Sequence, residues 1–156
     1  MFIPLASALL IGVIAGLRAF TAPAAVSWAA ALGWLDLSGS WLAFLGYKWT
    51  PYIFTGLAVL ELIGDQLPST PSRKVPVQFG TRIVLGGLAG AAFATGGGLP
   101  LVFGIMAGVL GAAIGTFAGA AGRAKLAAAF GRDLPAALTE DLIAVGGALL
   151  LILAVR

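Results

Sequence analysis

Residues 2–35 form a long apolar segment in which Arg18 is the only charged side chain. A straight helix of that length would measure roughly 50 Å, whereas the hydrocarbon core of a bilayer is about 30 Å thick. The segment must therefore break. Pro23 marks the place, because proline lacks a backbone donor and disfavours helical geometry in the residue before it. We predict a first helix near 3–20 and a second helical piece near 24–35.

Apolar residues dominate the rest of the chain as well: 60% of the 156 residues are hydrophobic and only 10% are charged. Soluble domains carry about 45–50% apolar and about 25% charged residues, and one of this length could not bury so much apolar surface in a single core. Lipid as the solvent explains the surplus, so we expect the bilayer to be the main partner of the chain. This composition predicts an integral membrane protein.

Cysteine and histidine are both absent from the chain. Disulfides, thiol catalysis, Cys/His metal sites and mechanisms that need a histidine base are thereby excluded, and only an oxygen-ligand cation site stays open. The net charge of +3 is not arranged as a basic stripe with interleaved aromatic residues, which argues against a nucleic-acid partner. We therefore expect no enzymatic activity, no cofactor, no metal centre and no nucleic-acid binding.

Aromatic residues and prolines divide the remainder of the chain into further elements. Trp and Tyr favour the lipid–water interface and predict an interfacial loop, and proline at a first helical position predicts where the next helix begins. We predict the loop at 36–50 and helical segments at 51–66, 81–96, 100–121, 122–131 and 135–155. With the interrupted first segment counted as one crossing, the fold is all-α, a polytopic transmembrane helix bundle of about five crossings with broken helices, in a single domain over 1–156.

Lysine and arginine residues gather around two loops, at Arg73, Lys74 and Arg82 and at Arg123, Lys125 and Arg132. Two predicted helices separate these loops, so both fall on the same side of the membrane. Loops rich in Lys and Arg favour the cytoplasmic side. We therefore expect the N-terminus in the cytoplasm, with the loop at 36–50 and Arg156 outside, in a bacterial inner membrane.

Two pairs of stretches resemble one another and suggest an internal repeat. The resemblance pairs 12–16 with 108–112 and 20–24 with 117–121. The expected topology turns the second copy over, which gives the inverted repeat common among transporters. The repeat units are 2–67 and 100–155, joined by a linking helix at 81–97. Chance is the competing explanation, because Ala and Gly are so frequent in this chain.

Arg18 is the first candidate site residue, because an arginine at the centre of a membrane helix costs about 2.5–3.5 kcal/mol on insertion scales. It lies beside the predicted break at Thr21 and Pro23, where freed backbone donors would also face a ligand. We predict that Arg18 binds an anion or serves as the counter-charge of an acid. The alternatives are a purely structural ion pair and a side chain that reaches out to the membrane surface.

Glu61 and Asp65 are the second candidates, and their spacing places both on one helix face. Asp65 lies near the end of its helix, where the helix dipole disfavours an anion, so it needs a partner. Arg18, Arg73 and a bound cation are the candidates. Two adjacent acids in a low dielectric resist simultaneous ionisation, which is the arrangement of a proton carrier. The alternative is an acid pair that simply faces the cytoplasm.

Glu140 and Asp141 complete the set of predicted site residues. If the last helix begins at residue 135, both acids lie more than a turn inside it and join the substrate or ion site. The alternative is ordinary: acids in the first turn of a helix interact favourably with its dipole, and Thr139 is suited to a local cap.

Two strings of the chain carry a family resemblance, GLRAFTAPA at 16–24 and ELIGDQLP at 61–68, the second followed by Pro71, Ser72 and Arg73. With these strings the chain resembles an uncharacterised bacterial integral membrane family, named domain of unknown function four-one-two-six. The resemblance covers essentially the whole chain. It implies a membrane protein, brings no activity with it, and points to Arg18, Glu61, Asp65 and Arg73 as the residues to test.

The function expected from these features is a small membrane transporter or permease with a site near the midplane, built from Arg18, Glu61 and Asp65. An arginine beside helix ends suits an anionic solute or a lipid headgroup, and the acids would couple its movement to protons. Because a chain of 156 residues makes a thin-walled bundle, we expect a homodimer. The alternative is a non-transporting membrane scaffold or partner subunit whose charges are structural ion pairs.

Overall fold

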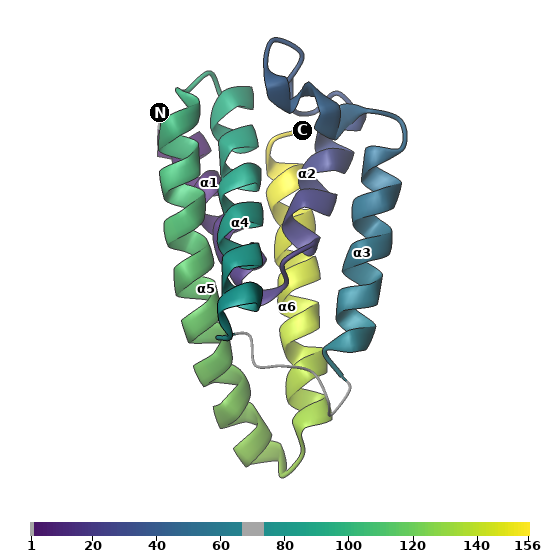
Figure 1. Ribbon diagram of the computed structural model, residues 1–156, viewed down its shortest axis with the longest axis vertical. Helices are drawn as coiled ribbons and strands as arrows, with labels where there is room; N and C mark the ends of the chain where they lie inside the picture. The colour runs from purple at the N-terminus through teal and green to yellow at the C-terminus, as the bar shows by residue number, and fades with distance from the viewer. Residues whose placement is uncertain (1, 67–73) are drawn as a thin grey trace.

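The protein folds into a bundle of helices, seen in a computed structural model that describes residues 2–66 and 74–156 (Figure 1). The elements are α1 (Phe2–Leu17), α2 (Thr21–Ala31), the 3-10 helix η1 (Trp41–Gly46), α3 (Thr50–Gly64), α4 (Pro76–Gly96), α5 (Leu101–Phe130) and α6 (Asp133–Ala154). These residues contain no strand, so the all-α class is confirmed. Helices α4, α5 and α6 are long and apolar enough to cross a membrane, and α1 and α3 are shorter apolar helices. These helices identify an integral membrane protein.

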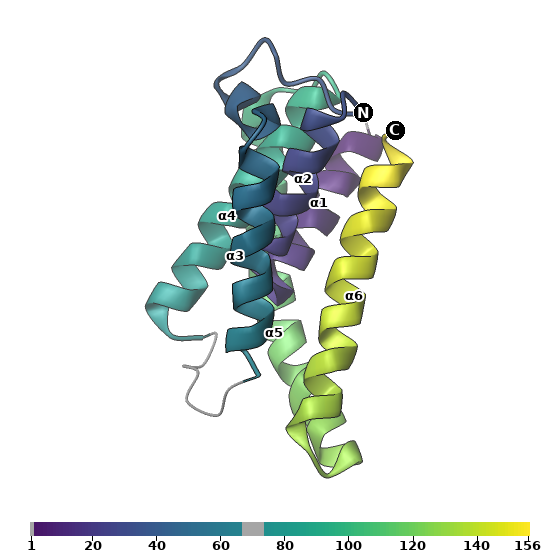
Figure 2. The same cartoon turned by 90° about the vertical axis from the view of Figure 1, so that its right-hand side faces the viewer.

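The predicted break in the first apolar segment is confirmed, but the chain reverses there instead of continuing across. Helix α1 ends at Leu17, and α2 begins at Thr21 with Pro23 in its first turn, where proline is tolerated. The chain ends and the loop after α2 all lie at one end of the bundle (Figures 1 and 2). Accordingly, Pro4 lies beside Gly97, and the Arg156 guanidinium lies 5.5 Å from the Trp34 ring centroid.

This reversal corrects two expectations about topology. Residues 2–35 form a helical hairpin, so they do not make one interrupted crossing. The N-terminus therefore lies at the same end as the 36–50 loop and Arg156, and the expectation that it lies opposite them is wrong. The physical reason is the short turn between the helices, which points α2 back toward the end from which α1 came.

Helix α5 is one continuous helix of 30 residues, where the sequence predicted an end near 121 and a separate piece at 122–131. The Ala-rich stretch contains no proline to interrupt it, so the hydrogen-bonded ladder continues to Phe130. Gly131 then adopts a φ of 69°, the left-handed conformation that commonly ends a helix. The other helices begin and end within about five residues of their predicted bounds.

Glycines set the contact between α1, α4 and α5. A Cβ on Gly12 would lie 2.3 Å from the Gly108 carbonyl oxygen, and one on Gly108 would lie 2.1 Å from the Gly86 carbonyl oxygen. Only residues without a side chain permit backbones to approach this closely in lipid. These three helices therefore form a tightly packed slab, which α2, α3 and α6 complete to a bundle.

The same contacts argue against the inverted repeat. Gly12 lies against Gly108, and Gly16 lies against Ala112, so residue numbers rise together along the two helices. Helices α1 and α5 are therefore parallel, whereas corresponding helices of an inverted repeat run in opposite directions. The matched stretches 12–16 and 108–112 resemble each other because both supply small residues to one interface.

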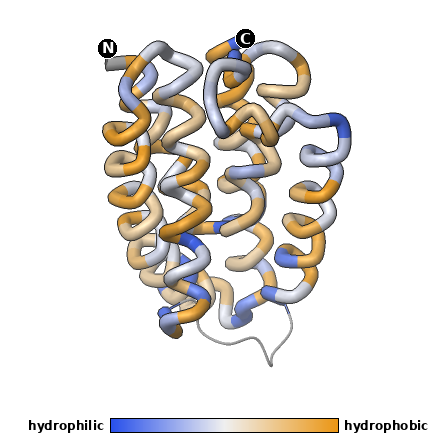
Figure 3. Tube along the Cα trace, turned by 45° about the horizontal axis from the view of Figure 1, so that its top comes forward, coloured by the Kyte–Doolittle hydropathy of each residue, from blue (hydrophilic) through white to orange (hydrophobic). Residues whose placement is uncertain are grey.

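Apolar side chains cover the outside of the bundle. Large hydrophobic residues such as Leu110, Leu142 and Leu150 are more than half exposed, as expected where lipid is the solvent. Trp41 and Trp49 are exposed at the end that carries the termini, which suits an aromatic belt at the interface. Most strongly hydrophilic positions gather toward the opposite end (Figure 3).

Candidate functional site

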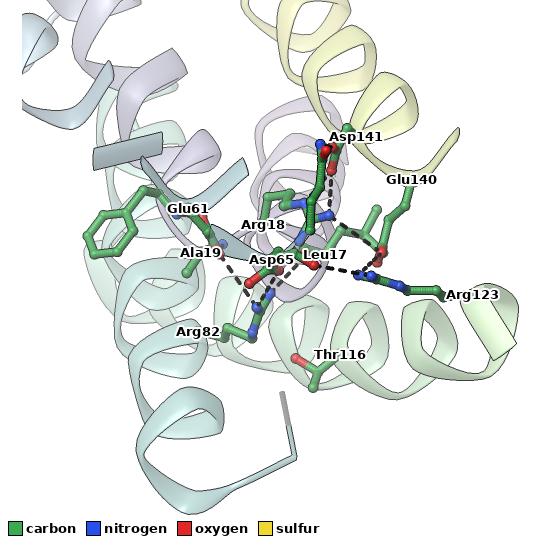
Figure 4. A network of polar contacts seen from close by, with 12 residues as sticks. Leu17, Arg18, Ala19, Glu61, Asp65, Arg82, Thr116, Arg123, Glu140 and Asp141 are labelled. Carbon is green, nitrogen blue, oxygen red and sulfur yellow. Dashed lines mark hydrogen bonds and ion pairs between the residues drawn. The ribbon is translucent and has the colours of Figure 1, made fainter. Parts of the chain in front are cut away.

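Most of the acidic residues of the protein meet three arginines where α1 ends (Figure 4). Of the six carboxylates in the sequence, Asp36 lies in the 36–50 loop and the other five are in this group. The charge cluster, as we call it, consists of Arg18, Arg82, Arg123, Glu61, Asp65, Asp133, Glu140 and Asp141. Its members come from the α1–α2 turn and from all four remaining α-helices.

Arg18 is the centre of the cluster and is fully buried. Its Nε donates a hydrogen bond to Asp141 Oδ1 at 2.6 Å, and its Nη1 donates to Asp65 Oδ2. Nη2 lies 2.5 Å from Asp141 Oδ1 and 3.9 Å from Glu140 Oε2. The side chain therefore does not reach out to the membrane surface. It bridges α3 and α6, because carboxylates from both helices replace the water that a guanidinium loses on burial.

Glu61 holds the start of α2. Its Oε1 accepts a hydrogen bond from the Ala19 amide at 2.7 Å, and its Oε2 accepts one from the Phe20 amide at 2.9 Å. Both amides lie in the turn between α1 and α2, next to the first residue of α2, where the helix end carries a partial positive charge. The freed backbone donors predicted beside Arg18 are therefore present, and the anion that they bind is the carboxylate of the protein itself.

Arg82 is a member of the cluster, although its place beside a basic loop predicted only a part in membrane orientation. Its side chain is 1% exposed, and its Nη1 donates to the carbonyl oxygens of Gly16 at 3.0 Å and Leu17 at 2.7 Å. Its Nη2 lies 3.5 Å from Glu61 Oε1 and 3.9 Å from Asp65 Oδ2. Arg82 thus satisfies carbonyls that the end of α1 leaves without helical partners.

Helical spacing is the signal that could have found Arg82. Gly86 and Gly90 follow it at intervals of four residues, so all three lie on the same face of α4. That face packs against α5 through its glycines and is buried. An arginine on the small-residue face of a membrane helix cannot reach water and must find partners inside the bundle.

Arg123 forms the rim of the cluster. Its Nε and Nη2 donate to the two carboxylate oxygens of Asp133 at 3.0 and 2.5 Å, and its Nη2 also donates to the Asp65 carbonyl oxygen at 3.2 Å. Its Nη1 lies 3.8 Å from Glu140 Oε2. Because the Asp133 side chain is 61% exposed, this pair joins the buried charges to the end of the bundle opposite the chain termini.

Five of the predicted site residues come together in this network: Arg18, Glu61, Asp65, Glu140 and Asp141. The remaining candidate, Arg73, lies outside the described residues. Thr21 and Pro23 open α2 as expected, and the buried Oγ1 of Thr21 has no hydrogen-bond partner among the described residues. No three described carboxylates are arranged to hold a metal ion. What the cluster offers chemically is carboxylates that accept hydrogen bonds and form ion pairs with guanidiniums that stay charged.

An apolar cavity of about 440 Å³ lies beside the cluster, where α2 packs against α3 and α6. Its lining includes Thr21, Trp28, Thr55, Leu62, Val145 and Ile152. The Trp28 indole Nε1 donates to Thr55 Oγ1 at 3.0 Å, so these two polar groups are satisfied by each other.

Comparison with known proteins assigns the family. The chain belongs to the family described as "Domain of unknown function (DUF4126)", whose model matches residues 5–155. The resemblance seen in the strings at 16–24 and 61–68 is thereby confirmed. No curated protein and no solved structure matches the chain.

Proposed function

We propose that the protein is a small proton-coupled membrane transporter and that the charge cluster is its coupling site. The observation that carries the proposal is the gathering of ionisable groups inside the bundle: among the residues that the structure describes, the cluster holds five carboxylates and three guanidiniums. Ionisable groups at membrane depth are costly and mark proton or substrate pathways. Carboxylates that lie close together in a low dielectric resist simultaneous ionisation, which favours the uptake of a proton.

Arg18 supplies the means of coupling. It binds Asp65 on α3 and Asp141 on α6 at the same time. When one of these carboxylates is protonated, its attraction to the guanidinium weakens and the other partner holds Arg18 more strongly. Protonation therefore shifts the balance between two arrangements of α3 and α6, which is what a transporter needs to link a proton to a change of shape.

The arrangement favours the proton-coupled part of the sequence-based expectation over its anionic solute. An anion or lipid headgroup would have to displace a carboxylate of the chain from Arg18 or Arg82.

For the placement in the membrane we propose four crossings by α3, α4, α5 and α6, with α1 and α2 as a hairpin that enters and leaves on one side. The bases that support an orientation are exposed Lys74, Lys125 and Arg132, near the ends of the helices opposite the chain termini. The positive-inside rule then puts the cluster end in the cytoplasm and both termini outside, in a bacterial inner membrane. The homodimer stays a prediction, to be checked by the mass of the detergent-solubilised protein.

Proton flux into proteoliposomes tests the proposal. Vesicles that contain the protein and an internal pH-sensitive dye are expected to acidify under an imposed membrane potential, several-fold faster than protein-free vesicles. Asp65→Asn removes a carboxylate that binds Arg18 and is expected to abolish the difference. Asp36→Asn is the matched control, because Asp36 is exposed and bonds to Ser38 instead of the cluster. Absence of any flux that depends on the protein would overturn the proposal.

A membrane scaffold is the second candidate, and the pairing of the arginines favours it. Each guanidinium of the cluster contacts at least one carboxylate. If the pairs serve only to fix helix register, exchanging Arg18 and Asp65 as Arg18→Asp with Asp65→Arg restores the stability that either single change removes. The scaffold would be favoured if the double variant regains stability and neither the natural protein nor the double variant carries proton flux.

A further inference from the structure

The apolar cavity between α2, α3 and α6 has no part in the proton-coupled function proposed above. We propose that it is a binding site for one acyl chain of a membrane phospholipid whose phosphate lies beside Arg156, at the end of the bundle that carries the chain termini. Three features of the structure carry this inference: the opening of the cavity to lipid, apolar walls that match the depth of one leaflet, and a basic, aromatic mouth.

The cavity lies where α3 and α6 do not meet. Among the described residues, each of these helices packs against α2, but their backbones hardly approach each other. Alanines on the three helices, Ala24, Ala58 and Ala148, line a volume of about 440 Å³ there. The lining residues Val59 and Leu149 are 48% and 51% exposed on the apolar outside of the bundle, so the cavity opens sideways to lipid. An occupant therefore enters from the bilayer.

The walls of the cavity suit a hydrocarbon chain in chemistry and in length. The Trp28 indole donates to Thr55 Oγ1, so these two polar groups satisfy each other. On α2 the lining runs from Thr21 at the start of the helix to Leu32 just past its end, roughly 16 Å at about 1.5 Å per residue. One leaflet contributes roughly 15 Å of hydrocarbon, half of the bilayer core. The cavity therefore matches an acyl chain that extends along the bundle from the interface toward the middle of the bilayer.

The mouth of the cavity, where Trp34 lines it, lies at the end of the bundle that carries the termini. The exposed Arg156 guanidinium lies over the Trp34 ring, 5.5 Å from its centroid. On the α3 side the Lys48 ammonium lies 5.4 Å from the Trp49 ring, which packs against Tyr52. Tryptophan and tyrosine favour the interface, and basic side chains bind the phosphates of lipid headgroups there. The mouth therefore favours a lipid with its phosphate on this side.

The deep end of the cavity separates an acyl chain from a solute with a polar head. Among the described residues no charged side chain lines the cavity, so neither a cationic nor an anionic head would find a counter-charge at that end. Thr21 lies there, 7% exposed, and its Oγ1 has no hydrogen-bond partner among the described residues. A solute that entered head first would bind this hydroxyl. An acyl chain has no use for it.

Quenching by a brominated phosphatidylglycerol tests the inference in maltoside micelles, which contain no phosphate. Bromine on the acyl chains should quench Trp28 saturably, at about one lipid per protein chain, and this part of the quenching should disappear in Trp28→Phe. The diacylglycerol with the same brominated chains lacks the phosphate and is expected to bind at least tenfold more weakly. Equal quenching by the two lipids, or quenching that does not saturate, would mean ordinary contact with lipid and would overturn the proposal.

Variants at the two ends of the site locate the chain and the phosphate. Ala58→Leu fills the cavity and should weaken phosphatidylglycerol binding at least tenfold, whereas Ala118→Leu, at an exposed position of α5 outside the cavity, leaves it unchanged. Arg156→Gln should weaken it several-fold without changing the binding of diacylglycerol. Arg132→Gln removes an exposed base near the opposite end and is the matched control. Binding that survives Ala58→Leu would overturn the cavity assignment, and equal effects of Arg156→Gln and Arg132→Gln would overturn the place of the phosphate.

Two further measurements keep the proposal testable if Ala58→Leu does not fold. Native mass spectrometry of the unchanged protein should show about one phospholipid retained per chain after the surrounding lipid is removed, and no retained lipid would contradict the site. Thr21→Val keeps the shape of the cavity and removes the hydroxyl. Phosphatidylglycerol binding is expected to stay the same in this variant, and a several-fold loss would assign the cavity to a solute with a polar head instead.

Discussion

At the scale of single residues, Arg18 shows why burial of a charge depends on its partners. Its guanidinium is fully buried, and it is tolerated because Asp65 and Asp141 contact it from two helices. Removing one partner of such a group leaves the others as uncompensated buried charges, which costs more than the pair itself contributes.

Arg18→Ala is therefore expected to lower the free energy of unfolding by about 3–5 kcal/mol, the usual cost of breaking a buried ion pair. Arg18→Lys should also destabilise, because an ammonium cannot reproduce the fork that meets Asp65 and Asp141 together. Thermal unfolding of the purified protein in detergent measures both. Arg123→Ala is the comparison. Because its partner Asp133 is 61% exposed, this variant should lose little free energy of unfolding. Equal effects of Arg18→Ala and Arg123→Ala would contradict the central place of Arg18.

At the scale of elements, the short helix α2 depends on a residue from another helix. Its N-cap residue Phe20 makes no side-chain cap bond, and the carboxylate of Glu61 on α3 instead binds the Ala19 and Phe20 amides just before α2 begins. A helix of 11 residues has little stability alone, so its start is fixed by this tertiary contact.

Glu61→Gln keeps one oxygen that accepts a hydrogen bond and turns a donor toward the other amide. We expect a loss of about 1–2 kcal/mol, as for removal of a helix cap. Hydrogen exchange should speed up at the Ala19 and Phe20 amides and in the first turn of α2, while amides of α4 keep their protection. Unchanged exchange at Ala19 and Phe20 would show that the cap is not made in the membrane.

The glycine contacts between α4 and α5 lead to a second prediction at this scale. A Cβ on Gly108 would lie 2.1 Å from a backbone oxygen of Gly86, and backbone cannot move aside as a flexible side chain does. Gly108→Ala should therefore separate the helices and destabilise the protein by at least about 1–3 kcal/mol. Gly122→Ala on the same helix is the control, because a Cβ there meets nothing within 4 Å. Thermal unfolding of the two variants measures the difference in stability, and equal melting temperatures would contradict the close contact.

At the scale of the whole molecule, the hairpin of α1 and α2 determines which ends of the bundle share a side. The natural absence of cysteine makes this testable with single introduced thiols. Ile3→Cys, Ser38→Cys and Arg156→Cys should all react with an impermeant maleimide from the same side of sealed vesicles, and Lys125→Cys from the other. If Ile3→Cys and Lys125→Cys are labelled from the same side, the hairpin is wrong and residues 2–35 cross the membrane once, as the sequence alone predicted.

Hydropathy and spacing by themselves determined that the chain is an all-α membrane protein, that its first segment breaks between Arg18 and Pro23, and that Asp65 is a candidate partner of Arg18. These are local properties, because apolar length, proline geometry and helical period act within a few turns of the chain. The burial of Arg82 had a local signal too, in the glycines that share its face, but its partners come from three other segments. The pairing of Asp141 with Arg18 came only from the structure.

Only the tertiary structure decided that α2 turns back beside α1, that Glu61 binds the amides just before α2, and that a cavity opens between α2, α3 and α6. A break in an apolar run says that a helix ends but not where the next one points, since lipid accepts either direction. The direction is set by which small residues meet across helices, as Gly12 meets Gly108, and such contacts join residues far apart in the chain.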